Sequence, residues 1–165
     1  MAWKLKWNAP EPEVLAYLPC FRRNRLVPDV ETGKIPNMMK KSAPTVLVVD
    51  DEALIRWSLS EAVGERGYVV SEAASAKTAI EAIQHAADPF DSVLLDFRLP
   101  DSADLRLLAK VRELAPDTQV IMITAHNSPE LAQGAAALGA FRVIDKPFEG
   151  ESLAALLNQA CSVKS

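Results

Sequence analysis

From Thr45 onward the sequence predicts an α/β domain in which helices cover both faces of a parallel sheet. Short apolar runs alternate with segments whose apolar residues recur at helical spacing, a pattern typical of βαβ units. The first run, residues 45–49, is continuously apolar after its first residue, as expected of a strand buried on both faces. Right-handed crossovers between parallel strands then place helices on both sides of the sheet.

Five strands and five helices are expected in alternation between residues 45 and 165. The strands are predicted at residues 45–49, 68–70, 92–95, 120–123 and 141–144. The helices that follow them are marked by apolar stripes at Ile55/Leu59/Val63, Ala79/Ile80/Ile83, Leu105/Leu108/Val111, a segment from Pro129 to Gly139, and Leu153/Leu156/Leu157. Gly67 is expected to end the first helix, Pro116 to stop the third, and Pro129 to begin the fourth.

The composition is that of a globular protein with one domain of ordinary size, since 49% of the 165 residues are apolar and 24% charged. No run of 18 or more apolar residues occurs, and no apolar segment of the secretory type follows Lys4 and Lys6. Cys20 and Cys161 lie far apart without metal-type spacing, which fits a reducing compartment. We therefore expect a cytoplasmic protein with no membrane partner.

The first part of the chain differs from the rest in charge and in proline content. Residues 1–44 hold eight Lys or Arg against four Asp or Glu, and six of the eleven prolines, without a sustained period. We expect an N-terminal extension over residues 1–43, disordered or loosely docked, and one domain over residues 44–165. An alternative is that translation begins at Met38 or Met39.

The predicted domain is acidic. Residues 45–165 hold ten Lys or Arg against eighteen Asp or Glu, a net charge of −8. A folded part with this charge would repel phosphates, so we do not expect direct binding to nucleic acid.

Polar residues follow four of the predicted strands: Asp50 and Asp51 the first, Asp96 the third, Thr124 the fourth and Lys146 the fifth. In open α/β sheets, sites lie beyond the carboxyl ends of the strands. Converging carboxylates repel one another unless a cation lies among them, and oxygen ligands that leave room for water suit Mg²⁺. A magnesium site beside a lysine and a hydroxyl has the groups needed for phosphoryl transfer to a carboxylate.

Four short segments carry a family resemblance: residues 48–52 (Val-Val-Asp-Asp-Glu), 94–101 (Leu-Leu-Asp-Phe-Arg-Leu-Pro-Asp), 123–125 (Ile-Thr-Ala) and 145–148 (Asp-Lys-Pro-Phe). With these segments in this order at the strand ends, residues 45–165 resemble the receiver domain of bacterial two-component signalling. The resemblance implies a flavodoxin-like, doubly wound (βα)5 fold, with a five-stranded parallel sheet in the order 2-1-3-4-5.

The resemblance also assigns roles to the residues at the strand ends. Asp96 would be the phosphoacceptor, and Lys146 would pair first with Asp96 and then with the phosphoryl group. Thr124 would donate its hydroxyl to a phosphoryl oxygen. The Lys146–Pro147 peptide bond would be cis, as X–Pro bonds readily can be.

A magnesium ion is the cofactor that the resemblance implies. Asp51 and Asp96 would bind it directly, Asp50 would help through water, and the backbone carbonyl of Arg98 would complete the protein's share of the ligands.

The implied partners are a sensor histidine kinase or phosphotransfer protein as phosphoryl donor, and an unidentified output partner or domain. A homodimer through the fourth helix, fifth strand and fifth helix is a further implied interaction. The domain would catalyse only its own phosphorylation and dephosphorylation, so it is not expected to be an enzyme acting on other substrates. Residues 99–102 and 120–124 are similar to receivers joined to sigma-54-dependent activators, and a stand-alone receiver is the alternative.

The sequence departs from the family pattern at three places, one of which is Arg98, which stands where it could lean over the site and change dephosphorylation. The aromatic residue usually found three positions before the lysine is Val143, and the aromatic Phe141 lies two residues earlier. A rotating aromatic side chain is therefore not expected at this position. Ser102 stands where the family often has glycine, and Ser102 or Asp104 is expected to cap the third helix.

Three other functions compete with this one. Phosphatases with an aspartate nucleophile usually carry a second aspartate two residues later, where this chain has Arg98. A dinucleotide-binding domain is excluded because no Gly-x-Gly-x-x-Gly follows the first strand. A receiver that binds its partner without ever being phosphorylated stays open because of Val143.

Overall fold

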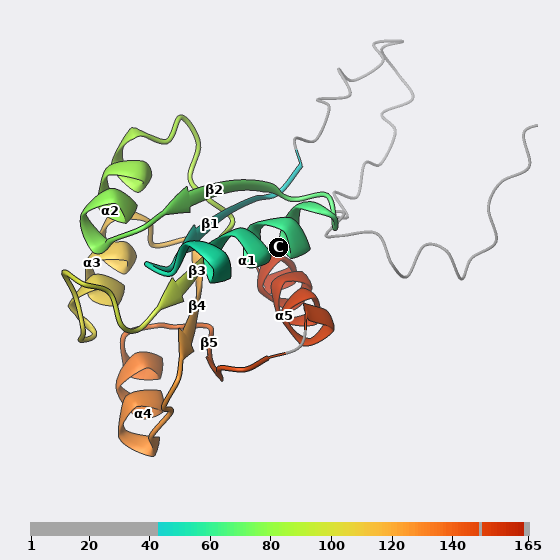
Figure 1. Ribbon diagram of the computed structural model, residues 1–165. Helices are drawn as coiled ribbons and strands as arrows, with labels where there is room; N and C mark the ends of the chain where they lie inside the picture. The colour runs from blue at the N-terminus through green and yellow to red at the C-terminus, as the bar shows by residue number, and fades with distance from the viewer. Residues whose placement is uncertain (1–42, 149, 164–165) are drawn as a thin grey trace, which may run out of the picture.

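The computed structural model describes residues 43–148 and 150–163, so the predicted extension lies, apart from Ala43, outside the described residues. Strands and helices alternate as predicted (Figure 1). The strands are β1 (Thr45–Val49), β2 (Val69–Ala73), β3 (Ser92–Asp96), β4 (Gln119–Thr124) and β5 (Arg142–Asp145). The helices are α1 (Ala53–Gly64), α2 (Ala76–His85), α3 (Arg106–Leu114), α4 (Pro129–Ala137) and α5 (Gly150–Val163).

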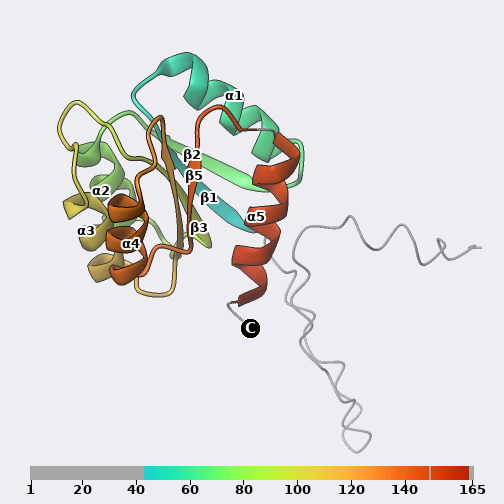
Figure 2. The same cartoon turned by 90° about the horizontal axis from the view of Figure 1, so that it is seen from below.

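All neighbouring strands pair in parallel, and the sheet has the order β2-β1-β3-β4-β5. The predicted doubly wound (βα)5 fold is therefore confirmed. Helices α1 and α5 cover one face of the sheet and α2, α3 and α4 the other, as the view from below shows most clearly (Figure 2). Because the order reverses between β1 and β3, the loops after these two strands leave toward opposite faces and open the crevice in which such sheets carry their sites.

Two apolar cores hold the helices to the sheet, and alternate residues of each central strand belong to different cores. In β1, Leu47 packs with the cluster under α2, α3 and α4, whereas Val48 packs with the cluster under α1 and α5. Both side chains are fully buried. Burial on both faces fixes the positions of the central strands and of the residues at their ends.

At two elements whose bounds differ from the prediction, a side chain at the end of the element makes a hydrogen bond. Tyr68 was expected in the second strand, but β2 begins one residue later, and the Tyr68 hydroxyl donates to Asn158 Oδ1 of α5 at 2.9 Å. The third helix begins at Arg106 with Leu105 as its N-cap, so neither Ser102 nor Asp104 is the N-cap, although Asp104 Oδ1 accepts from the Arg106 N–H at 2.9 Å. The fourth helix begins at Pro129, as predicted, and the chain turns away from it at Gly139 with a φ of +85°.

Among the helices of the described residues, none is long and apolar enough to cross a membrane.

Candidate functional site

Three carboxylates meet at the carboxyl edge of the sheet. Asp50 follows β1 directly, Asp51 comes next, and Asp96 is the last residue of β3, the strand that pairs with β1. One carboxylate oxygen from each of the three lies within 4.8 Å of the others. Asp50 is only 1% exposed and Asp96 7%, whereas Asp51 is open to solvent. The sequence prediction that these side chains converge is confirmed.

Lys146, the residue after β5, bridges the two buried carboxylates. Its Nζ donates to Asp50 Oδ2 at 2.8 Å and to Asp96 Oδ2 at 2.6 Å. Burial raises the pKa of Asp50, and the hydrogen bond from Lys146 opposes this only in part. Burial alone would lower the pKa of Lys146, but its hydrogen bonds to Asp50 and Asp96 outweigh that effect and raise the pKa. The two carboxylates therefore favour the positively charged form of Lys146.

The remaining oxygen of each buried carboxylate is held by the local backbone. Asp50 Oδ1 accepts from the Glu52 N–H at 2.8 Å, and Asp96 Oδ1 accepts from the Arg98 N–H at 3.1 Å. Among the described residues, the Asp51 carboxylate has no hydrogen-bond partner. At both Asp50 and Asp96 the chain makes a turn in which the carboxylate accepts from the N–H two residues later, a geometry that Asp adopts readily.

The charges at this edge do not balance. Three carboxylates face one ammonium group, which leaves two negative charges next to each other in a partly buried position. A divalent cation would balance them, and carboxylate oxygens are ligands that Mg²⁺ accepts. The donor set therefore fits a hard divalent cation.

Thr124 ends β4 beside this cluster, but its hydroxyl points toward its own loop. The Oγ1 donates to the His126 carbonyl and accepts from the His126 N–H, both at 3.2 Å. The following residue is tied to β5, because the Asn127 N–H donates to Asp145 Oδ1 at 3.1 Å. Thr124 is 1% exposed, so its hydroxyl exchanges partners only if the loop between β4 and α4 moves.

The Lys146–Pro147 peptide bond is cis, as the sequence prediction holds.

Comparison with known proteins identifies this arrangement. The family model of the response regulator receiver domain matches residues 46–158, which is most of the chain. The chain belongs to this family. The match includes all four strand ends at which Asp50, Asp51, Asp96, Thr124 and Lys146 lie.

This receiver domain is similar in sequence to curated regulators and in structure to solved receiver domains. The DNA-binding transcriptional regulator NtrC of Escherichia coli (strain K12) is 34% identical over 117 residues, which are 71% of this chain and 24% of that protein. The chain thus spans about a quarter of the length of such curated relatives. A CheY-like receiver domain from Methanospirillum hungatei JF-1 superposes with a TM-score of 0.71 at 29% identity, over 74% of this chain and 97% of that one.

A third relative was solved in a modified state. The structure of a response regulator protein from Burkholderia pseudomallei "with a phosphorylated aspartic acid, calcium ion and citrate" has a TM-score of 0.64 and 30% identity. It covers 73% of this chain and 71% of that one.

The position three residues before Lys146, where the family usually has an aromatic residue, is Val143 in this receiver domain. Val143 of β5 packs with the cluster under α2, α3 and α4. Phe141 precedes the strand and packs with the opposite cluster, next to α5. Phe141 therefore lies on the other side of the sheet and cannot substitute at the Val143 position.

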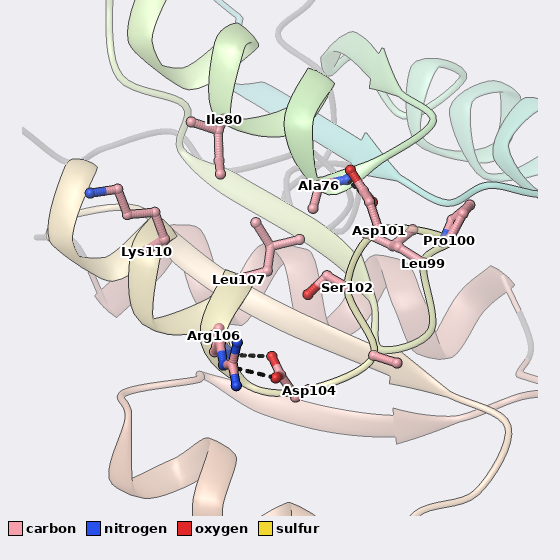
Figure 3. Close-up of a pocket in the computed structure, with 11 residues that line it drawn as sticks. Ala76, Ile80, Leu99, Pro100, Asp101, Ser102, Asp104, Arg106, Leu107 and Lys110 are labelled. Atoms are coloured by element: carbon pink, nitrogen blue, oxygen red, sulfur yellow. Dashed lines mark hydrogen bonds and ion pairs between the residues drawn. The ribbon is translucent and has the colours of Figure 1, made fainter.

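One carboxylate of the receiver domain has a role that the sequence did not predict. Asp101, in the loop after β3, points to the start of α2, where its Oδ1 accepts from the Ala76 N–H at 2.8 Å (Figure 3). Its Oδ2 accepts from the Lys77 N–H at 2.9 Å. Asp101 and Ala76 line a cavity of about 490 Å³ between α2 and α3. The loop that leaves Asp96 is thus bonded directly to a neighbouring helix.

Replacing Asp101 by alanine should lower the free energy of unfolding by about 1 kcal/mol at pH 7, because two N–H groups at the start of α2 lose their acceptor. Hydrogen bonds from the Lys77 and Ala76 N–H groups hold the pKa of Asp101 below its usual value. The ionised carboxylate therefore contributes fully above the unfolded-state pKa of about 3.9, and its contribution is lost as the pH falls through the folded-state pKa.

Urea unfolding of the wild type and Asp101→Ala at pH 7 and pH 3 measures this effect. The difference should shrink at pH 3. Asp88→Ala is the matched control, because Asp88 is exposed and has no hydrogen-bond partner among the described residues. An equal loss in both variants would contradict the capping role.

Proposed function

We propose that this receiver domain accepts a phosphoryl group on Asp96 from the phosphohistidine of a sensor histidine kinase or a phosphotransfer protein. A carboxylate oxygen of Asp96 forms a bond to phosphorus while the phosphorus–nitrogen bond breaks and the imidazole leaves. The observation that carries the proposal is the Lys146 ammonium, which bridges Asp50 and Asp96 beside the unbonded Asp51 carboxylate. The phosphorylated aspartic acid of the similar Burkholderia pseudomallei response regulator supports it.

We propose Mg²⁺ as the cation of this site. Asp51, Asp96 and the backbone carbonyl of Arg98 would hold it, with Asp50 acting through water. The ion would supply positive charge to the phosphoryl oxygens and lower the repulsion between them and the carboxylates. The Arg98 residue is exposed, and its backbone N–H donates to Asp96 Oδ1, so its backbone lies next to the carboxylates.

The chain's own residues would respond to the new charge in two ways. Lys146, already a donor to Asp96, keeps its position and pairs with a phosphoryl oxygen. Thr124 gives up the His126 carbonyl and donates its hydroxyl to the phosphoryl group, which moves the loop between β4 and α4. The movement of this loop alters the surface of α4, β5 and α5, where we place the output partner or a second copy of the domain. Such a switch corresponds to about 1–3 kcal/mol of coupling.

The wider context of the domain is also a proposal. We assign residues 44–165 to the receiver domain and residues 1–43 to an extension, and we propose a cytoplasmic location, which the sparse, widely separated cysteines of the sequence support. The similarity to NtrC, a DNA-binding transcriptional regulator, supports an output of that class in which another part of the regulator binds DNA. The domain itself catalyses only its own phosphorylation and dephosphorylation.

Intact-protein mass spectrometry after incubation with acetyl phosphate tests this function. With Mg²⁺ we expect a single adduct of about 80 Da, the mass of one phosphoryl group, and with EDTA none. Reduction of the adduct with borohydride converts an acyl phosphate to an alcohol, so peptide mapping should place the change at Asp96. The absence of an adduct with Mg²⁺ would favour a receiver that binds its partner without phosphorylation, and an adduct elsewhere would overturn the assignment of Asp96.

A further inference from the structure

Arg56 of α1 reaches back to the loop between β1 and α1, which carries two of the three acidic residues. Its Nη1 donates to the Asp50 carbonyl at 2.8 Å and lies 3.5 Å from the Asp51 carbonyl. Its Nε donates to Glu72 Oε2 of β2 at 3.1 Å. The Arg56 side chain is only 18% exposed, so this arginine packs against the loop rather than extending into water.

Arg56 bonds to the backbone of the acidic loop and not to its carboxylates. Among the described residues its one ion pair is with Glu72. It therefore does not neutralise the cluster by direct pairing, as Lys146 does. Its contacts restrain the peptide groups on either side of Asp51.

The direction of the Asp51 carboxylate depends on this backbone. Asp51 is exposed, and its carboxylate has no hydrogen bond within the part of the chain that the structure describes. The peptide that joins it to Asp50 is held by Arg56, which donates to the Asp50 carbonyl, and the preceding peptide is held by the Asp50 N–H, which donates to the Ala73 carbonyl at 3.2 Å. Glu72 and Ala73 are neighbours in β2, so the end of this strand fixes the loop both directly and through Arg56.

We propose that Arg56, oriented by Glu72, is a positioning residue that presets the Asp51 carboxylate for the divalent cation. This inference rests on the magnesium site proposed above and assigns the residues that give that site its shape. Partners that orient metal ligands typically change metal affinity by about 10–100-fold when removed, and we expect about a tenfold weaker affinity for Mg²⁺ in Arg56→Gln.

Positioning and simple electrostatics predict opposite results for this variant. If the guanidinium acted only as a nearby positive charge, it would repel Mg²⁺, and Arg56→Gln would bind the ion more tightly. If it positions the loop, Arg56→Gln binds more weakly. Arg56→Lys separates the two effects further, because lysine keeps the charge but lacks the planar group that donates to a carbonyl and a carboxylate at once.

The test is isothermal titration of Mg²⁺ into the full chain and its variants, without phosphoryl donor. We expect Arg56→Gln and Arg56→Lys to bind about tenfold more weakly than the wild type, and the double variant Arg56→Gln/Glu72→Ala to bind no more weakly than Arg56→Gln alone. Arg66→Gln is the matched control, because Arg66 lies beyond the other end of α1 and donates to the Ala62 carbonyl. It should bind within about twofold of the wild type, as distant charges are screened.

Urea unfolding without Mg²⁺ checks that each variant is folded. If Arg56→Gln does not fold, the Mg²⁺ affinities of the single variants Arg56→Lys and Glu72→Ala test the positioning role instead. Phosphorylation from acetyl phosphate should recover in the Arg56 variants as Mg²⁺ is raised to saturation. Wild-type affinity in Arg56→Lys, or tighter binding in Arg56→Gln, would overturn the positioning role. Asp51→Asn separates this failure from a wider one: if it too binds Mg²⁺ like the wild type, the proposed metal site falls and the role of Arg56 with it.

Discussion

Asp96→Asn should reduce incorporation of the phosphoryl group from acetyl phosphate to below about 1% of the wild-type level. The variant keeps the shape of the side chain, but the amide oxygen is a poor nucleophile. The neutral amide also removes one of the two carboxylate charges that pair with Lys146. Asp96 is 7% exposed and accepts a hydrogen bond on each oxygen, so the NH₂ group of the asparagine replaces one acceptor and one of these two hydrogen bonds is lost.

Intact-protein mass spectrometry over a time course with Mg²⁺ measures this loss. Asp104→Asn is the matched control, because Asp104 lies in the same loop but pairs with Arg106 on the surface. It should be modified at the wild-type rate. An adduct that persists in Asp96→Asn at the wild-type level would show that another carboxylate, with the exposed Asp51 first to be tested, accepts the phosphoryl group.

Lys146→Met should be the most destabilising change at the site, with a loss of about 3 kcal/mol in the free energy of unfolding at pH 7 without Mg²⁺. Methionine fills similar space but leaves Asp50 and Asp96 buried beside each other with no cation. The pKa of Asp50 is already raised by burial in the wild type, and removing the lysine takes away the largest opposing effect.

The sign of the pH dependence follows from that raised pKa. A carboxyl group with a higher pKa in the folded than in the unfolded state binds more protons when folded, so it favours folding at low pH and loses this contribution as the pH rises through the folded-state pKa. The deficit of Lys146→Met against the wild type should therefore be smaller at pH 5 than at pH 7.

Urea unfolding at both pH values, with and without Mg²⁺, measures the deficit, and Mg²⁺ should reduce it by supplying the missing positive charge. Lys110→Met is the control, because Lys110 pairs with Glu113 on the surface of α3 and should cost less than about 1 kcal/mol. A Lys146→Met protein as stable as the wild type at pH 7 would mean that the two carboxylates do not need this counter-charge.

The sequence was sufficient for the fold and for the residues that meet at the site. Continuous apolar runs and helical patterns locate strands and helices because burial on the sheet selects them, and the carboxyl ends of parallel strands share one edge. The meeting of Asp50, Asp96 and Lys146 could therefore be predicted from the sequence alone. Their ion pairs and the convergence with Asp51 agree with that expectation.

The contacts that sequence could not predict join residues with no periodic relation. Asp101 bonds the start of α2, 25 residues earlier, and Arg56 pairs with Glu72, 16 residues later. Each depends on the direction of a loop, which neither propensity nor apolar spacing specifies. The hydroxyl direction of Thr124 is similar, because it depends on the course of the loop between β4 and α4, where the hydroxyl donates to the His126 carbonyl.

The bridge from Lys146 to Asp50 joins residues 96 positions apart in the chain, and this separation has a consequence for biosynthesis. During translation Asp50 and Asp96 leave the ribosome well before β5 and the lysine that follows it. A nascent or truncated chain that ends before Lys146 contains the residues of β1 and β3 but lacks the ammonium group that lies at their ends in the complete domain. If the proposed role of Lys146 holds, the ability to carry a phosphoryl group is acquired only when the last strand has joined the sheet, and we expect an incomplete chain not to be phosphorylated.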